Sequence, residues 1–130
     1  MSKHLMAGGA ALALCAVLAG PAGAHHSFAM FDSTQTMNTK ATVVQWQWTN
    51  PHSFLECTIN GQQWNLESGS PGMITHVGAS RLSFKPGDIV TVSFHPRRDK
   101  TLGGQLLSAT GADGKVYPFD SVHQPLPPGQ

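Results

Sequence analysis

The clearest alternation of apolar and polar residues lies within residues 39–48. Val44, Trp46 and Trp48 share one face of an extended chain, and Val43 begins the opposite face, which otherwise carries glutamines. A period of two with β-branched and aromatic residues is typical of a half-buried strand. We therefore expect a strand over 39–48 that turns its tryptophans to one side.

A proline corner follows this strand. Asn50 and Pro51 stop the alternation, because proline cannot donate to a strand ladder and biases the residue before it to extended or turn geometry. His52 comes directly after the corner. We therefore expect its imidazole at the rim of a sheet rather than in the middle of a strand.

Shorter alternating runs along the rest of the chain predict further strands and one helix. Asn60 and Gly61 form a strong hairpin signal, because both residues tolerate positive φ. Ser70 followed by Pro71 is typical of a helix start, and Gly78 of its end. The strands expected after the first one cover 53–59, 63–67, 89–95, 105–109 and 116–119.

The order of these elements predicts the fold class. Three strands, a short helix and then two or three strands make an all-β protein with one short helix, and this is the order of a small OB-like five- to six-stranded barrel, the oligonucleotide/oligosaccharide-binding type. A small sandwich is the alternative. In such a barrel the connections between strands one and two and between strands four and five flank the ligand face. Here these connections carry His52 and the loop that starts at His95.

The first 24 residues have the pattern of a secretory signal peptide. Lys3 precedes an apolar run, and Ala22-Gly-Ala24 is a small-residue cleavage pattern. The run is shorter than the about 20 residues that a membrane span needs, so we expect no membrane anchor. The sequence predicts an exported protein, periplasmic or secreted, with a signal peptide at 1–24, an N-terminal arm at 25–38, an OB-like β-barrel domain at 39–120 and a disordered tail at 121–130.

Charge and cysteine content exclude several classes of protein. The chain has eight Lys and Arg against seven Asp and Glu, and loss of Lys3 with the signal peptide leaves these charges balanced. Balanced charge argues against binding to nucleic acid or to a membrane surface. Loss of Cys15 leaves Cys57 alone, so we expect no internal disulfide, and the apolar neighbours of Cys57 favour a buried structural thiol.

Four motifs point to a known family. They are Ala24-His-His-Ser-Phe28, Trp48-Thr-Asn-Pro-His52, Glu67-Ser-Gly-Ser-Pro71 and Leu82-Ser-Phe-Lys-Pro-Gly-Asp88, the last followed by a Val-x-Val strand. Together they resemble a family of small exported bacterial proteins that is catalogued only as a domain of unknown function. The resemblance covers nearly the whole mature chain, and it implies export and a small β domain. It transfers no activity and no catalytic residues.

Histidine dominates the candidate chemistry, because six of the seven histidines follow the expected cleavage site. A cut after Ala24 makes His25 the first residue, and a free amine beside an imidazole can chelate Cu(II). A cut one or two residues earlier puts His26 or His25 third, where the amine, backbone amides and imidazole bind square-planar copper. The alternatives are a solvated arm without metal and structural roles for the other histidines. The candidate metal ligands are His25, His26, His52 and His95, with copper as the candidate cofactor.

A second candidate chemistry is the binding of an organic ligand. Trp46, Trp48 and Trp64 could form a platform on which sugar rings or bases stack. Arg97, Arg98 and Lys100 could hold an anionic group. Burial in the core is the alternative for the tryptophans. A solvated loop is the alternative for the arginines, which Asp99 follows.

Motifs of common enzyme classes are missing from the sequence. It has no Gly-x-Ser-x-Gly elbow, His-Glu-x-x-His, Cys-x-x-Cys or phosphate-binding glycine loop. We therefore assign no catalytic residues and expect a binding or accessory protein rather than an enzyme. Its expected partner is a small ligand, a metal ion or another periplasmic protein. A saccharide- or anionic-ligand-binding OB-like module without metal is the alternative to copper binding.

Overall fold

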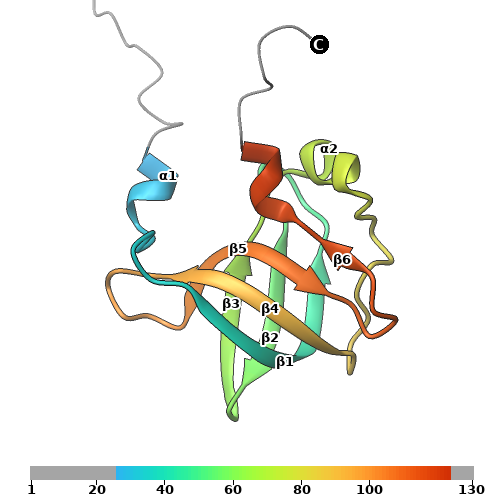
Figure 1. Cartoon of the computed structure of the whole chain (residues 1–130), viewed down its shortest axis with the longest axis horizontal. Coiled ribbons are helices and arrows are strands. Elements are labelled where there is room, and N and C mark those ends of the chain that lie inside the picture. The colour runs from blue at the N-terminus through green and yellow to red at the C-terminus, as the bar shows by residue number, and fades with distance from the viewer. Residues whose placement is uncertain (1–25, 124–130) are drawn as a thin grey trace, which may run out of the picture.

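Six strands form one sheet that closes on itself in the computed structural model, which describes residues 26–123 (Figure 1). The predicted signal peptide, His25 and residues 124–130 lie outside the described residues. The strands are β1 (Met37–Gln47), β2 (Phe54–Ile59), β3 (Gln62–Glu67), β4 (Ile89–Pro96), β5 (Gly103–Thr110) and β6 (Val116–Tyr117). The helical elements are α1 (His26–Ala29), α2 (Pro71–Ile74), η1 (Thr75–Val77) and η2 (Phe119–His123).

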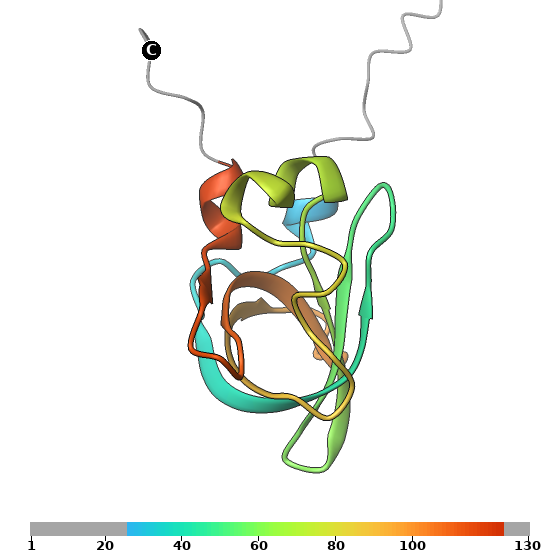
Figure 2. The same ribbon diagram turned by 90° about the vertical axis from the view of Figure 1, so that its right-hand side faces the viewer.

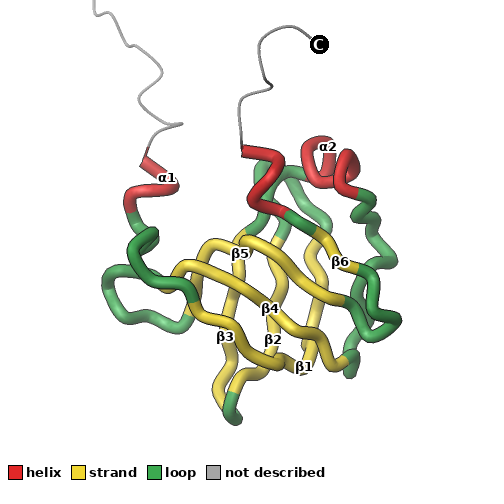
Figure 3. The backbone as a smooth tube through the Cα atoms, viewed as in Figure 1, coloured by secondary structure: helices red, strands yellow, loops and turns green. Residues whose placement is uncertain are grey.

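The strand order confirms the predicted fold class. The sheet runs β3-β2-β1-β4-β5-β6, and a parallel pairing of β3 with β5 closes β1 to β5 into a five-stranded barrel, while β6 extends β5. All other strand pairs are antiparallel, and α2 lies between β3 and β4 in the chain. This is the OB-type arrangement. Figure 3 shows the strands wrapping around one axis, with helical segments gathered at one end.

One detail of the β1 prediction is wrong. Alternation places Val44 and Trp46 on one face, but the register with β2 shifts between Val43 and Gln45, so Val44 is the extra residue of a β-bulge. Val43 and Trp46 both point into the barrel, and Val44 is exposed. The bulge therefore reverses the phase of the alternation in the middle of the strand.

The predicted helix after β3 is confirmed, and its ends follow from local chemistry. Ser70 Oγ accepts a hydrogen bond from Met73 N at 3.4 Å, and Pro71 occupies the first turn, where no backbone donor is needed. The helix tightens into η1 and ends at Gly78, whose φ of 81° is the left-handed conformation that glycine adopts most easily.

The core fills the barrel and extends under the helical segments at one end. Leu55, Leu66, Val92 and Phe94 point inward from three strands, β2, β3 and β4, and are fully buried. α2, η1 and η2 lie together over one end of the barrel in two perpendicular views (Figures 1 and 2). Their apolar side chains, such as the buried Phe119, continue the core.

Two glycines sit where the barrel closes. A Cβ on Gly104 would lie 2.5 Å from Phe94 Cδ2 and 2.6 Å from the carbonyl oxygen of His95. A Cβ on Gly103 would lie 2.7 Å from Arg97 Nε. Because neither residue carries a side chain, β5 can approach β3 and β4 at once.

The segment before β1 packs against the connection between β4 and β5. Phe31 is buried and pairs with Arg97 as an isolated bridge, Asp32 N donates to Pro96 O at 2.8 Å, and Arg98 N donates to Met30 O at 2.9 Å. Part of the predicted arm therefore lies along the barrel. Between residues 26 and 123, the structure contains no helix with the length and apolarity to cross a membrane.

Candidate functional site

The corner between β1 and β2 positions His52 beside a carboxylate. Thr49 Oγ1 donates to the carbonyl of His52 at 2.8 Å and the Asn50–Pro51 peptide bond is cis. His52 Nδ1 lies 2.5 Å from Glu67 Oε1, with the side chains 37% and 14% exposed. An ionised carboxylate only accepts hydrogen bonds, so Nδ1 carries the proton and Nε2 is the ring nitrogen that can bind a ligand.

The β2–β3 hairpin explains why Glu67 is the partner. The turn after Ile59 sets a register that continues to Phe54 opposite Glu67. Backbone pairing goes on past the strand ends, since Ser53 N donates to Gly69 O at 3.0 Å and Ser68 N donates to Ser53 O at 2.8 Å. His52 is therefore held at the end of the hairpin, next to Glu67.

His95 is also oriented by its Nδ1 atom. This atom lies 2.7 Å from the carbonyl oxygen of Gln35 and 3.4 Å from Thr36 Oγ1. A backbone carbonyl can only accept, so Nδ1–H donates and Nε2 is left as the acceptor of a neutral ring. The same atom pattern at His52 and His95 gives both imidazoles an outward-facing nitrogen suited to a metal.

One row of paired residues runs across the strands from His95 to Glu67, the partner of His52. His95 pairs with Gln105 of β5, and Gln105 pairs with Glu67 of β3. Directly paired residues lie on the same face, and their neighbours Phe94 and Leu66 are buried inside, so this row lies on the outer face. Two strand spacings separate His95 from Glu67, about 10 Å. The two imidazoles therefore stand on either side of the Glu67–Gln105 pair.

The four proposed metal ligands are not all within the described structure. His25 lies outside it, and His26 is described only as the first residue of α1. No group of three or more His, Cys, Asp or Glu side chains within the described part of the chain could hold a metal ion by itself. A metal at His52 or His95 would therefore need further ligands of another kind or from outside that part of the chain.

Two of the three tryptophans predicted as a stacking platform, Trp46 and Trp48, are core or near-core residues. Trp46 is 8% exposed, and its Nε1 donates to Ser80 O at 2.9 Å. Its ring lies 5.1 Å from Phe84 and 5.9 Å from Trp48, centroid to centroid. Trp48 is partly buried against the same core. Both rings pack mainly on other side chains of the barrel.

The two arginines of the β4–β5 connection have different roles. Arg98 Nε donates to Ala29 O at 3.1 Å, and its guanidinium lies 3.7 Å from Asp32, so Arg98 fastens the N-terminal segment. Arg97 is half-buried, and its Nε has no hydrogen-bond partner among residues 26–123. It lines a pocket of about 210 Å³ together with Trp64, whose buried Nε1 also has no partner there.

Three side chains have a shifted pKa. Hydrogen bonds from Thr34 lower the pKa of Asp32, and hydrogen bonds from Thr101 lower the pKa of Asp99. Burial raises the pKa of Cys57 to about 11, which agrees with the expected structural thiol. The two carboxylates therefore stay ionised and rigidify the turns on either side of the pocket.

Sequence patterns missed two of the residues that define these sites. Glu67 was expected at the end of a strand and at the start of a family motif, but not as a partner of His52, although the hairpin signal at Asn60 and Gly61 fixes its pairing with Phe54. Gln35 contacts His95 through its carbonyl oxygen and therefore leaves no signal in side-chain chemistry.

The barrel and its polar rim define a small β-barrel protein of the OB type. The model of a family of unknown function, DUF6152, matches residues 13–106. The chain therefore belongs to this family, in agreement with the motif resemblance. Neither the curated proteins nor the solved structures contain a significant match.

Proposed function

We propose that this protein is an exported, periplasmic binding or accessory protein that holds one Cu(II) ion at the rim of its barrel. The N-terminal amine and the imidazole of His25 supply two nitrogens, and His52 supplies a further one, with His95 as the second candidate for that position. Amine and imidazole nitrogens suit the tetragonal geometry of Cu(II).

The contact between His52 and Glu67 is the observation that carries this proposal. Histidines that bind metals almost always donate their other ring N–H to a carboxylate or a carbonyl, which fixes the tautomer and the ring orientation. His52 Nδ1 makes such a contact with Glu67 at 2.5 Å. The exposed fraction of the His52 side chain, 37%, leaves room for a ligand on the other side of the ring.

The position of α1 also supports the proposal. α1 starts at His26, one residue after the proposed chelating terminus. Figures 1 and 2 show α1 toward the same end of the barrel as the connection between β1 and β2, which carries His52. α1 and the corner that carries His52 therefore lie at the same end of the barrel.

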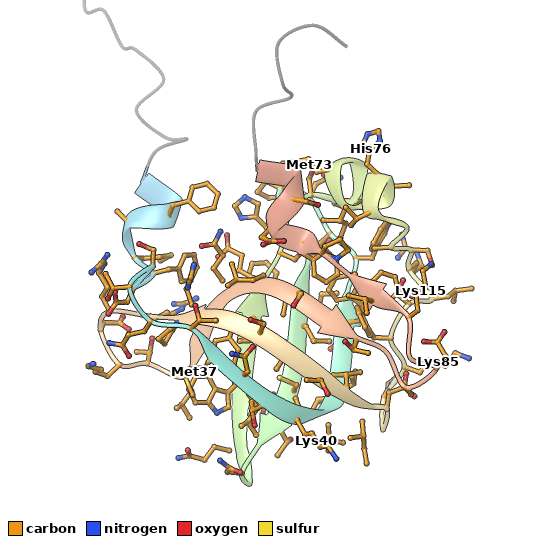
Figure 4. The ribbon with its side chains drawn as sticks, in the orientation of Figure 1. Met37, Lys40, Met73, His76, Lys85 and Lys115 are labelled. Atoms are coloured by element: carbon orange, nitrogen blue, oxygen red, sulfur yellow. The ribbon has the colours of Figure 1, made fainter. Side chains whose placement is uncertain are left out.

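Copper content and spectroscopy test the proposal. Untagged protein purified from the periplasm should contain about one copper per chain by mass spectrometry of metals, and its intact mass should start at His25. Electron paramagnetic resonance should show nitrogen hyperfine coupling that changes in His52→Ala or in His95→Ala. His76→Ala is the matched control, because His76 lies in η1 and its ring points away from the barrel (Figure 4).

Two results would contradict the proposal in different ways. Spectra unchanged by both His52→Ala and His95→Ala would reduce the site to an N-terminal chelate that does not involve the barrel. Binding no tighter than that of a denatured control would remove copper altogether.

A further inference from the structure

A pocket of about 210 Å³ opens between the β4–β5 connection, the segment before β1 and Trp64 of β3. We propose that this pocket binds a small organic carboxylate. The pocket contains no histidine, so the inference goes beyond the proposed copper site and does not rest on it.

Two buried donors in the pocket wall are without partners. Trp64 Nε1 and Arg97 Nε have no hydrogen-bond acceptor in the described part of the chain, and both residues line the pocket. A buried N–H group without a partner is costly, so such groups are nearly always satisfied by protein, water or a ligand. Both N–H groups are themselves buried, so an acceptor-rich ligand in this pocket would satisfy them once the side chains around them shift.

The charge balance of the pocket favours an anion. Arg97 and Lys100 bring two positive charges to its wall, and neither takes part in an ion pair within the described residues. The one acidic lining residue, Asp32, accepts from Thr34 N at 3.1 Å, from Thr34 Oγ1 at 2.6 Å and from Gln35 at 2.9 Å, and it lies 3.7 Å from Arg98. Two positive side chains against one negative give the lining a net charge of +1, which favours a negative group.

The donor types narrow the anion to a carboxylate with an apolar body. A guanidinium presents N–H groups in a fork that matches two carboxylate oxygens. The Trp64 ring, Met37 and Pro96 form an apolar part of the wall. This combination suits a ligand with a charged head and a short hydrocarbon chain.

The size of the pocket suits a small ligand. Its volume of about 210 Å³ is below that of pockets for drug-sized molecules, about 300–1,000 Å³. A short carboxylate matches this volume.

Local contacts order Arg97 and the backbone around Lys100 before any ligand binds. The absence of a side chain at Gly103 lets Arg97 lie flat over β5, where a Cβ would be 2.7 Å from Arg97 Nε. Thr101 donates to Asp99 through its backbone N at 3.0 Å and its hydroxyl at 2.6 Å, which closes the loop around Lys100. Pre-organised groups lose little freedom on binding.

A titration of the exported, metal-free protein tests this assignment. Acetate, butyrate and succinate are added at constant ionic strength, and backbone and indole signals are followed by nuclear magnetic resonance. We expect saturable shifts of the Trp64 indole and of Gln35 and Thr101, with butyrate binding more tightly than acetate because of the apolar wall. Phosphate and sulfate, added in separate titrations, should bind at least tenfold more weakly than butyrate.

Substitutions in the pocket wall test whether butyrate binds in this pocket. Arg97→Met and Lys100→Gln should each weaken butyrate binding about tenfold, and Trp64→Phe, which keeps a ring but removes the indole N–H, should weaken it several-fold in calorimetry. Lys85→Gln is the matched control, since it also removes one positive charge, and Figure 4 shows Lys85 on the opposite side of the barrel from Met37. If the Arg97→Met variant does not fold, the butyrate affinities of Lys100→Gln and Trp64→Phe test the proposal in its place.

Three results would overturn the proposal. They are the absence of saturable shifts, an equal loss of affinity in Lys85→Gln, and equally tight binding of phosphate or sulfate. Because the protein is free of metal in this experiment, failure here leaves the copper proposal untouched, and failure to bind copper leaves this pocket untouched.

Discussion

Across the end of the β2–β3 hairpin, His52 Nδ1 lies 2.5 Å from Glu67 Oε1. His52 precedes β2 by two residues and Glu67 ends β3, so the hairpin itself brings the pair together. The pair therefore depends on the register of this hairpin, together with the corner before β2 in which Thr49 holds the His52 carbonyl.

Replacement of Glu67 by Gln should weaken copper binding while leaving the fold intact. An amide accepts the His52 N–H less strongly than a carboxylate does, and loss of such a partner lowers metal affinity about 10- to 100-fold. Competition titration with a copper chelator measures the change. Glu56→Gln removes the same charge from another outer position, where Glu56 accepts from Gln47, and an equal loss there would show that only general electrostatics matter.

Gly104→Ala should destabilise the barrel by about 1–3 kcal/mol, because the new Cβ would overlap Phe94 and the His95 carbonyl. Chemical denaturation measures the free energy of unfolding. Gly72→Ala is the matched control: Gly72 lies in α2, and its Cβ would meet nothing within 4 Å. We expect this control to be neutral or stabilised by about 0.4–1 kcal/mol. Equal stability of both variants would mean that closure tolerates a side chain at Gly104.

Cys57 should not react with a disulfide reagent such as dithiobis(nitrobenzoic acid) at pH 8 while the protein is folded. Its side chain is fully buried and its pKa is raised to about 11, so almost no thiolate is present and none is accessible. Absorbance of the released thiolate follows the reaction. One thiol per chain should react promptly in denaturant, and rapid reaction without denaturant would contradict the buried position.

The turn around Asp32 should loosen on acidification. Hydrogen bonds from Thr34 lower the pKa of Asp32 below its ordinary value of 3.8, so the folded state favours the carboxylate. The resulting stabilisation is fully present above pH 3.8 and is lost as pH falls through the lower folded-state pKa. Amide signals of Thr34 and Gln35 should move in this acid range, and Asp32→Asn should show the loosened signals already at pH 7. Signals that stay constant in both tests would rule out this role of the carboxylate.

The local sequence pattern is sufficient to predict where most of the strands lie. β2, β3 and β4 begin and end within one residue of the predicted positions, because a period of two, the Asn60–Gly61 turn and proline corners are properties of short segments. The same turn also sets the register that pairs Glu67 with Phe54 at the start of β2. The position of Glu67 in the proposed copper site therefore follows from the hairpin.

Other features depend on contacts that no short segment encodes. The bulge at Val44 adds one residue to β1 and changes which side chains face inward, and alternation alone cannot reveal an extra residue. The packing of Phe31 along the β4–β5 connection is a long-range contact, and the chain that follows Phe31 supplies Asp32, Gln35 and Met37 to the pocket wall. Trp64 was one of three tryptophans in the sequence, and only the folded barrel distinguishes its unpartnered indole from that of Trp46.

The parallel pairing of β3 with β5 has a consequence for how quickly the protein reaches its folded form. Only three residue pairs, Asn65–Gly103, Leu66–Gly104 and Glu67–Gln105, join the two strands, and α2, η1 and β4 lie between them in the chain. Such non-local pairing requires a long loop to close before any contact is gained, so it forms late and slows folding. The hairpin of β2 and β3 can form early, which means that the His52–Glu67 pair should be in place before the barrel is shut.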